Sequence, residues 1–310
     1  MPSDLRIIFM GTPEFAVASL DAILQADYNV VAVITAPDKP AGRGMQLTES
    51  AVKKFAVAKG IPVLQPEKLK DPAFQAQLHA LNADLQIVVA FRMLPESVWN
   101  MPRMGTVNLH GSLLPQYRGA APINWAVING EHETGVTTFQ LQQDIDTGSI
   151  LLQDRFPIAD TDTAGDVHDR MKVIGAQLLV KTINGLAAGT LAATPQQNPA
   201  DLKHAPKIFT ETCRIDWNKS TAEIYNLIRG LSPFPAAFTE LDGKTLKVFR
   251  SEKELRPPGT APGTLDTDGK TYLRFAAPDG YIRITELQLE GKKKMAIGDF
   301  LRGYRFSANS

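Results

Sequence analysis

Short β-branched runs alternate with amphipathic segments through roughly the first 190 residues of the chain. In the longest amphipathic segment, Val167, Met171, Ile174 and Leu178 recur at the i, i+4, i+7 spacing of one helix face. Such alternation predicts an α/β domain built on a doubly wound, mostly parallel sheet. The predicted strands are Leu5–Phe9, Tyr28–Ile34, Ile61–Leu64, Leu85–Phe91, Thr106–His110, Gly135–Leu141 and Ile150–Phe156, and Phe15–Gln25 and Asp166–Leu186 are predicted helices.

The hydrophobic pattern changes after this region. Residues 191–206 have neither helical nor strand period and contain three prolines, which predicts a linker. Beyond it, the hydrophobic residues of 217–231 recur with the period of a helix. Short stretches of alternating hydrophobic and polar residues follow, separated by Asp-Gly pairs, and this pattern predicts a small β-barrel. We therefore expect a first domain over 1–190, a linker over 191–206 and a second domain over 207–310. The alternating stretches are Leu246–Arg250, Thr271–Ala276 and Tyr281–Leu289, with Asp-Gly at 242–243, 268–269 and 279–280.

The composition is that of a soluble globular protein, with 44% hydrophobic and 21% charged residues in 310. Apolar runs such as residues 87–91 are far shorter than the ~20 residues that cross a bilayer, and the start of the chain does not resemble a leader, so we expect a cytoplasmic protein without a membrane partner. The single cysteine, Cys213, excludes an intrachain disulfide. We expect no metal, because no metal-binding spacing joins the five histidines, His79, His110, His132, His168 and His204.

Charge is distributed unevenly between the two halves. Residues 206–310 contain 17 Lys and Arg against 13 Asp and Glu, a net charge of +4, and the totals of 33 and 33 leave −4 for residues 1–205. This mild excess permits a polyanionic partner for the second domain but does not require one.

The candidate chemistry lies in two segments. Asn108 and His110 are two residues apart on the predicted strand 106–110, so their side chains point to the same face near its carboxyl end. Asp146 follows in an Asp-Thr-Gly turn. Taken singly, each residue is explained as a locally satisfied polar group at a strand end or turn. Together they supply an oxyanion donor, a proton carrier and a carboxylate to orient it, which are the groups that move an acyl group onto an amine.

These residues also carry a family resemblance. The segment Asn-Leu-His-Gly-Ser-Leu-Leu-Pro at 108–115, followed by Tyr-Arg-Gly-Ala-Ala-Pro at 117–122 and Asp-Thr-Gly at 146–148, resembles the core signature of the folate-dependent formyltransferases. Segments 11–15, 37–44, 214–217 and 291–295 are similar, in order and position, to the members of this family that act on methionyl-tRNA. The resemblance covers nearly the whole chain. It implies a Rossmann-like catalytic domain followed by an OB-like β-barrel that binds tRNA.

The resemblance implies that the protein transfers the formyl group of 10-formyltetrahydrofolate to the amino group of methionine on initiator methionyl-tRNA, in translation initiation. Asn108, His110 and Asp146 would be catalytic, and we expect a monomer. An alternative is a formyltransferase of the same fold that acts on an amino sugar nucleotide or on glycinamide ribonucleotide. A rival from another class is an RNA-binding protein with a degenerate transferase domain, which the complete catalytic trio disfavours.

The same resemblance implies the binding residues. Folate would contact the segment after a buried strand and the segment after His110. The tRNA would contact a Gly-Pro loop over residues 38–45 and a lysine run in the second domain, although composition alone also fits solvated surface. The predicted folate residues are Phe91, Arg92, Met93, Leu94, Ser112, Leu113, Leu114 and Pro115, and the predicted tRNA residues are Lys39, Arg43, Lys292, Lys293 and Lys294.

Overall fold

The structure is a computed structural model that describes residues 4–41, 46–197 and 199–306. It divides into two compact units, and the chain passes between them repeatedly. The first unit comprises Met1–Arg118, Gly135–Phe156 and His168–Lys203, and the second comprises Gly119–Thr134, Pro157–Val167 and His204–Ser310.

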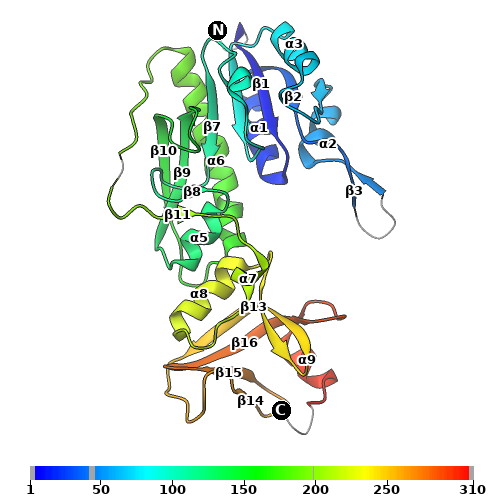
Figure 1. The fold of residues 1–310 in the computed structure, drawn as a ribbon, viewed down its shortest axis with the longest axis vertical. Helices are drawn as coiled ribbons and strands as arrows, with labels where there is room; N and C mark the ends of the chain where they lie inside the picture. Colours follow the sequence, from blue (N-terminus) through cyan, green and yellow to red (C-terminus); the bar gives the residue numbers. More distant parts are fainter. Residues whose placement is uncertain (1–3, 42–45, 198, 307–310) are drawn as a thin grey trace. The chain divides into compact units, whose positions relative to one another are not determined.

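A seven-stranded sheet forms the centre of the first unit, in the order β10-β9-β7-β6-β1-β2-β5 (Figure 1). The strands from β5 to β7 run parallel to their neighbours, and β9 is antiparallel to β7. This confirms the mostly parallel sheet. The strands are β1 (Arg6–Gly11), β2 (Asn29–Ile34), β5 (Val63–Leu64), β6 (Leu85–Val89), β7 (Thr106–His110), β9 (Glu133–Gln140) and β10 (Ile150–Pro157).

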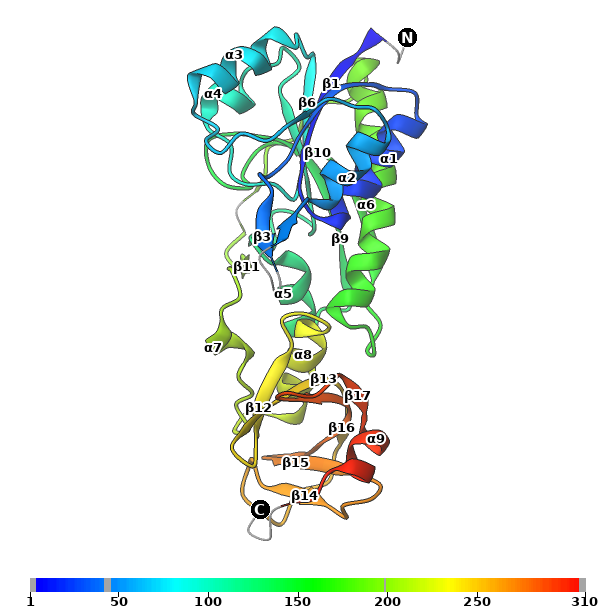
Figure 2. The same cartoon turned by 90° about the vertical axis from the view of Figure 1, so that its right-hand side faces the viewer.

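Helices cover both faces of this sheet (Figure 2). On one face, Ile8, Met10, Ile34 and Val88 pack against apolar side chains of α3 and α4, because alternate strand residues point to the same side. The other face is covered by α1, α2 and α6. The helices are α1 (Glu14–Gln25), α2 (Ala51–Ala58), α3 (Pro72–Ala80), α4 (Glu96–Trp99) and α6 (Ala164–Ala187).

The strand order reverses between β1 and β6. From β1 the chain adds β2 and β5 on one side, and it then returns to add β6, β7 and β9 on the other. In doubly wound sheets, ligands bind beyond the carboxyl ends of the strands at such a reversal. The ends of β1 and β6 therefore mark the expected binding edge, and β7 lies next to β6.

Most predicted strands are confirmed, and Thr106–His110 coincides with β7. One limit differs. The strand predicted to reach Phe91 ends at Val89, because Ala90 adopts a left-handed conformation with φ 48° that turns the chain out of the sheet.

An antiparallel sheet in the order β12-β13-β16-β15-β14, with β17 on β16, forms the second unit and curls into a half-barrel, as expected of an OB-like domain (Figure 1). Helices α5, α7, α8 and α9 accompany it. The bounds are α5 (Pro122–Ile128), α7 (Thr210–Cys213), α8 (Thr221–Leu231), β12 (Ala237–Leu241), β13 (Lys244–Glu254), β14 (Leu265–Thr267), β15 (Leu273–Ala277), β16 (Gly280–Leu289), β17 (Met295–Ala296) and α9 (Ile297–Gly303).

Local chemistry sets the limits of these elements. The helix predicted from residue 217 begins at Thr221, because Ser220 and Glu223 form a capping box that fixes its first turn. Asp242 and Gly243, with φ of 49° and 73°, form the predicted turn between β12 and β13. The turn predicted at 279–280 lies one residue earlier, since Gly280 already pairs with Ala277.

The predicted linker contains ordered pairing. Thr194 exchanges two backbone hydrogen bonds of 2.8 Å with Ile150 at the start of β10. Strand β11 (His204–Ala205) pairs with β8 (Arg118–Gly119). Pairings of one or two residues are too short to show the alternation of hydrophobic and polar residues that marks a strand, so the sequence pattern does not predict them.

Candidate active site

Asn108 and His110 lie on one face of β7 at the carboxyl edge of the first unit's sheet. The backbone of β7 is fixed on both sides, because Asn108 lies opposite Val88 of β6 and Phe139 of β9. His110 is buried, with 7% of its surface exposed, and Asn108 is partly buried. Within the described part of the chain, the Asn108 side-chain amide makes no hydrogen bond, so it is available to a ligand.

The His110 ring is held by a backbone carbonyl. Its Nε2 lies 2.9 Å from the carbonyl oxygen of Tyr117. A carbonyl oxygen can only accept, so Nε2 carries the proton and Nδ1 is the basic nitrogen of the neutral ring. The sequence does not predict that Tyr117 orients His110, because the contact is made by a backbone oxygen, which every residue has.

Asp146 faces the other ring nitrogen. Its Oδ2 lies 3.8 Å from His110 Nδ1, and 12% of the aspartate side chain is exposed. Nδ1 and the carboxylate would attract each other once Nδ1 is protonated. The prediction that Asp146 lies beside His110 is thus supported by geometry, but Tyr117 rather than Asp146 provides the hydrogen bond that orients the ring.

The Asp-Thr-Gly turn has a backbone that few residues tolerate. Asp146 itself is left-handed, with φ 55°, a conformation in which short polar residues are enriched. A Cβ on Gly148 would lie 1.6 Å from the carbonyl oxygen of Gln140, so only glycine fits there. The motif therefore fixes where the carboxylate is presented.

The loop after His110 is tied to β9 and β10. Thr137 Oγ1 donates to the carbonyl of Ser112 at 2.7 Å and accepts from the Leu114 amide at 3.1 Å. Gln153 Nε2 donates to the Leu114 carbonyl and to Thr137 Oγ1, each at 2.9 Å. Ser112 Oγ donates to the Gln116 carbonyl at 2.7 Å. Of the predicted folate residues here, Ser112 and Leu114 are buried, and Leu113 and Pro115 are partly buried.

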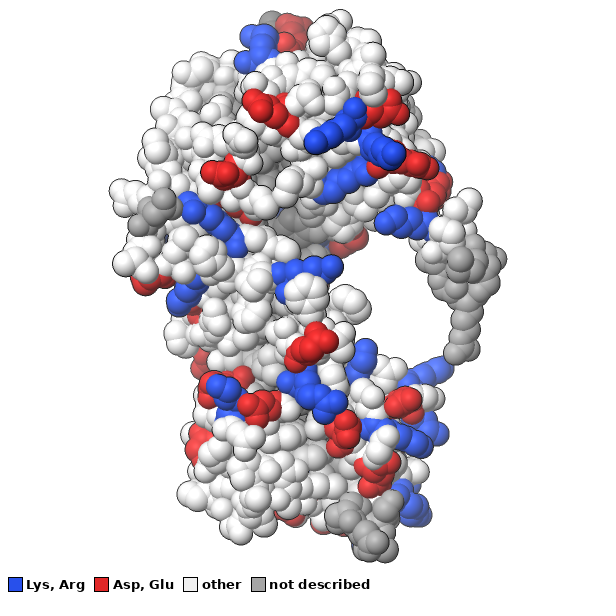
Figure 3. Space-filling view, in the orientation of Figure 1, with Lys and Arg blue, Asp and Glu red and all other residues white. Residues whose placement is uncertain are grey.

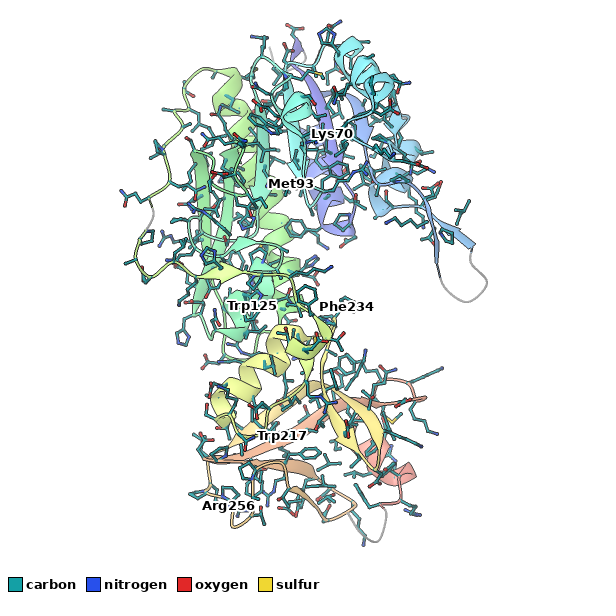
Figure 4. All side chains as sticks on the ribbon, viewed as in Figure 1. Lys70, Met93, Trp125, Trp217, Phe234 and Arg256 are labelled. Atoms are coloured by element: carbon teal, nitrogen blue, oxygen red, sulfur yellow. The ribbon has the colours of Figure 1, made fainter. Side chains whose placement is uncertain are left out.

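The other predicted folate segment lies at the strand reversal, directly after β6. Arg92 does not extend into solvent: Nη1 donates to the carbonyl of Glu67 at 2.8 Å, and Nη2 donates to that of Pro66. Burial lowers the pKa of its guanidinium. Arg92 Nε is buried and has no partner among the described residues. Phe91 is partly buried and Leu94 is buried, whereas Met93 has 72% of its surface exposed (Figure 4).

The described part of the predicted tRNA loop contains β3 (Lys39–Ala41), which pairs with β4 (Gln46–Thr48) and extends away from the sheet of the first unit (Figure 1). Lys39 is exposed. Arg43 lies outside the described residues. The base of the β3–β4 pair is held by Asp38, which pairs with Lys53 and accepts from Gln65 Nε2 at 2.8 Å.

In the second unit, Lys292, Lys293 and Lys294 follow β16 and are exposed. Lys294 differs from the other two: its Nζ lies 2.8 Å from Glu286 Oε2 and 4.7 Å from the centre of the Phe249 ring. Figure 3 shows that basic side chains of this unit lie among acidic ones in this view. The positive charge of the run is therefore partly neutralised.

Three further features bear on the chemistry of the described residues 4–41, 46–197 and 199–306: metal-binding groups, membrane-spanning helices and the single cysteine. These residues contain no group of three or more His, Cys, Asp or Glu placed to hold a metal ion. No helix among them is both long and apolar enough to cross a membrane. Cys213 is buried, and burial raises the pKa of its thiol, which disfavours a nucleophilic thiolate.

Comparison with known families identifies both parts of the chain. Residues 5–183 match the formyl transferase family, and residues 207–305 match the formyl transferase C-terminal domain. The chain belongs to the formyl transferase family.

Close relatives of this formyl transferase extend over almost its full length. A methionyl-tRNA formyltransferase of Parabacteroides distasonis is 58% identical over 312 residues, which cover 97% of this chain and 96% of the relative. A methionyl-tRNA formyltransferase of Bacteroides thetaiotaomicron is 54% identical, with coverage of 98% and 97%.

Solved structures share the fold at lower identity. The sugar 3N-formyl transferase WlaRD has a TM-score of 0.69 and 22% identity, with coverage of 93% of this chain and 99% of WlaRD. HypX from Aquifex aeolicus in complex with tetrahydrofolic acid has a TM-score of 0.67 and 19% identity, with coverage of 98% of this chain and 49% of HypX. At this identity the likeness concerns the fold alone.

Proposed function

We propose that this formyl transferase moves the formyl group of 10-formyltetrahydrofolate to the α-amine of methionine on initiator methionyl-tRNA and so serves translation initiation. The observation that carries the proposal is the near full-length identity of 54% to 58% with methionyl-tRNA formyltransferases, in a chain that keeps Asn108, His110 and Asp146 together. Sugar formyl transferases share only the fold, at 22% identity, which favours tRNA over a small acceptor.

Each catalytic side chain has a role that its geometry supports. His110 Nδ1, as the basic nitrogen, takes a proton from the attacking amine and returns it to the leaving nitrogen of the donor. Asp146 stabilises the imidazolium formed in between. The Asn108 amide donates to the oxygen on which negative charge develops, a contribution on the order of 3 kcal/mol. The bond from amine to formyl carbon forms as the bond from formyl carbon to the donor nitrogen breaks.

The residues at the strand reversal fit the formyl donor, which supplies an activated formyl carbon. A flat pterin presents hydrogen-bonding edges and an apolar face, and the segment after β6 offers the exposed thioether of Met93 and, among the described residues, the unpartnered Arg92 Nε. We propose that Phe91, Arg92, Met93 and Leu94 border the pterin. Ser112, Leu113, Leu114 and Pro115 would form the other side, with Ser112 acting through the shape of its loop because its hydroxyl already bonds Gln116.

Lys39 in the first unit and the lysines at 292–294 in the second are exposed, and their charge suits the phosphates of tRNA. We propose that Lys39 of β3 and Arg43 contact the acceptor end, and that Lys292, Lys293 and Lys294 contact the backbone elsewhere. The pairing of Lys294 with Glu286 favours Lys292 and Lys293 as the stronger contributors.

We further propose a catalytic domain over 1–190, a linker over 191–206 and a tRNA-binding domain over 207–310, acting as a monomer in the cytoplasm, where translation takes place. The matches of the two family segments, 5–183 and 207–305, support this division.

One acceptor comparison tests the proposal. The purified protein is incubated with 10-formyltetrahydrofolate and, in separate reactions, with initiator methionyl-tRNA, an amino sugar nucleotide and glycinamide ribonucleotide. We expect formylmethionine on the tRNA and no product from the small acceptors. Formylation of a small acceptor without any of methionyl-tRNA would overturn it. Light scattering of the purified protein tests whether it is a monomer in solution.

A further inference from the structure

Gln196 lies in the segment predicted as a linker, and its side chain bonds to Asp146 and Gly148 on one side and to Arg118, which follows Tyr117, on the other. Its Nε2 donates to the carbonyl of Asp146 at 2.9 Å and to that of Gly148 at 2.7 Å. Its Oε1 accepts from Arg118 Nε at 3.1 Å and from Arg118 Nη2 at 2.7 Å. All of these residues belong to the first unit.

A primary amide offers two donor hydrogens and two acceptor lone pairs. Gln196 therefore uses its whole hydrogen-bonding capacity on protein partners, and it is only partly buried. A glutamine in a solvated linker would meet these needs with water. Its neighbour Gln197 is exposed and makes no side-chain hydrogen bond to the described residues, which shows the contrast within one segment.

The partners of Gln196 are the segments that hold the catalytic pair. Asp146 is left-handed, with φ 55°, and Tyr117, whose carbonyl orients His110, is left-handed with φ 59°. Arg118 follows Tyr117 directly. Left-handed conformations of non-glycine residues persist where surrounding contacts enforce them. Gln196 ties the segment that presents the carboxylate to the segment that orients the imidazole.

Backbone pairing anchors this bridge on both sides. Thr194, two residues before Gln196, exchanges two backbone hydrogen bonds with Ile150. Further along, the Lys203 carbonyl accepts from the Tyr117 amide at 2.7 Å, and the Lys203 amide donates to Gln116 Oε1 at 2.7 Å. Described residues on either side of Gln196 are thus bonded to the loops that it bridges.

We propose that Gln196 is a positioning residue for formyl transfer, which sets the approach of Asp146 to His110 from outside the signature motifs. This inference rests on the proposed roles of His110 and Asp146. Displacement of a reacting group by ~1 Å can cost ~10²-fold in rate, so the loss of a bridge to both loops should be visible in catalysis.

The test uses the full-length protein and single-turnover formylation of whichever acceptor the wild-type protein formylates. We expect Gln196→Ala to lower the rate by about 10-fold to 100-fold, with the Kd for 10-formyltetrahydrofolate within about 2-fold of wild type. Gln197→Ala is the matched control and should keep the wild-type rate. Gln196→Glu separates the two sides, because its carboxylate can accept from Arg118 but cannot donate to the Asp146 and Gly148 carbonyls. It should be as impaired as Gln196→Ala.

A double-mutant cycle distinguishes positioning from general loss of structure. If Gln196 acts through Asp146, its substitution should cost little further rate in an Asp146→Ala background, because residues that act as a unit are not additive. A wild-type rate in Gln196→Glu, or fully additive losses in the cycle, would overturn the proposal. Failure of the proposed function would appear separately, as a wild-type protein that formylates another acceptor.

Discussion

Two His–Asp pairs in this molecule have nearly the same spacing but very different surroundings. His110 Nδ1 and Asp146 Oδ2 in the first unit are 3.8 Å apart, and their side chains are 7% and 12% exposed. His132 Nδ1 and Asp160 Oδ1 in the second unit are 3.7 Å apart, and their side chains are 86% and 84% exposed. Distance alone therefore does not distinguish the proposed catalytic pair from the exposed one.

The difference lies in what holds each pair. His110 is fixed by the Tyr117 carbonyl, and Asp146 by a turn that only glycine at 148 permits. Water screens the exposed pair, and no hydrogen bond from another described residue fixes the side chain of His132 or Asp160. Burial with a fixed geometry is what allows a charge formed during the reaction to be stabilised without reorganisation.

The largest fall in rate is expected when the buried histidine is replaced. His110→Ala should lower the single-turnover rate by about 10² to 10⁴-fold, because it removes the proposed proton carrier. Asp146→Ala should lower the rate by at least ~10²-fold, since the imidazolium loses its counter-charge. The control is His132→Ala, which removes the exposed member of the matched pair and should leave the rate unchanged. Equal losses in His110→Ala and His132→Ala would contradict the comparison.

Asn108 should come next in effect. Asn108→Ala should lower kcat by about 10² to 10³-fold while the Kd for the folate donor changes little, because an oxyanion donor acts on charge present only near the transition state. Asn108→Asp should be worse, since a carboxylate would repel that charge. Stopped-flow binding paired with single-turnover rates separates the two quantities. A raised Kd with an unchanged rate would make Asn108 a ground-state ligand instead.

The sequence pattern predicts where Asn108 and His110 lie, but it does not predict the contacts that hold them. Strand alternation was sufficient to place Asn108 and His110 on one face, because the period of a strand fixes side-chain direction. The Tyr117 carbonyl and the Gln196 bridge were not predictable, because a backbone oxygen has no residue signature and Gln196 lies in a proline-containing stretch without period. The pairing of Lys294 with Glu286 also depends on how β16 and the following turn fold.

A smaller effect is expected at the exposed lysines, where binding rather than chemistry should change. Lys292→Ala with Lys293→Ala should reduce the slope of log affinity for tRNA against log salt by about 0.7 to 0.9 for each phosphate that the lysines no longer neutralise. Lys294→Ala is the comparison and should change the slope by less than half as much as the double substitution, because its charge is paired with Glu286. Filter binding across a salt series measures both. Identical slopes for all variants and wild type would make these lysines solvated surface.

The smallest effect concerns a third acid–base pair, Asp38 with Lys53. Their side chains are 23% and 17% exposed, so this pair is more exposed than His110–Asp146 and less exposed than His132–Asp160. The hydrogen bond from Lys53, followed by that from Gln65, holds the pKa of the Asp38 carboxyl below its usual range. A carboxyl with a lower pKa in the folded state contributes stability above its unfolded pKa of about 3.9, and this stability is lost as pH falls through the folded pKa.

Asp38→Asn should therefore lower Tm modestly at pH 7, and the difference in Tm from wild type should shrink below about pH 4. Asp4→Asn, which changes an exposed carboxylate near the start of the chain, controls for net charge. A Tm difference that stayed constant from pH 7 to pH 3 would show that Asp38 stabilises the base of the β3–β4 pair through shape rather than charge.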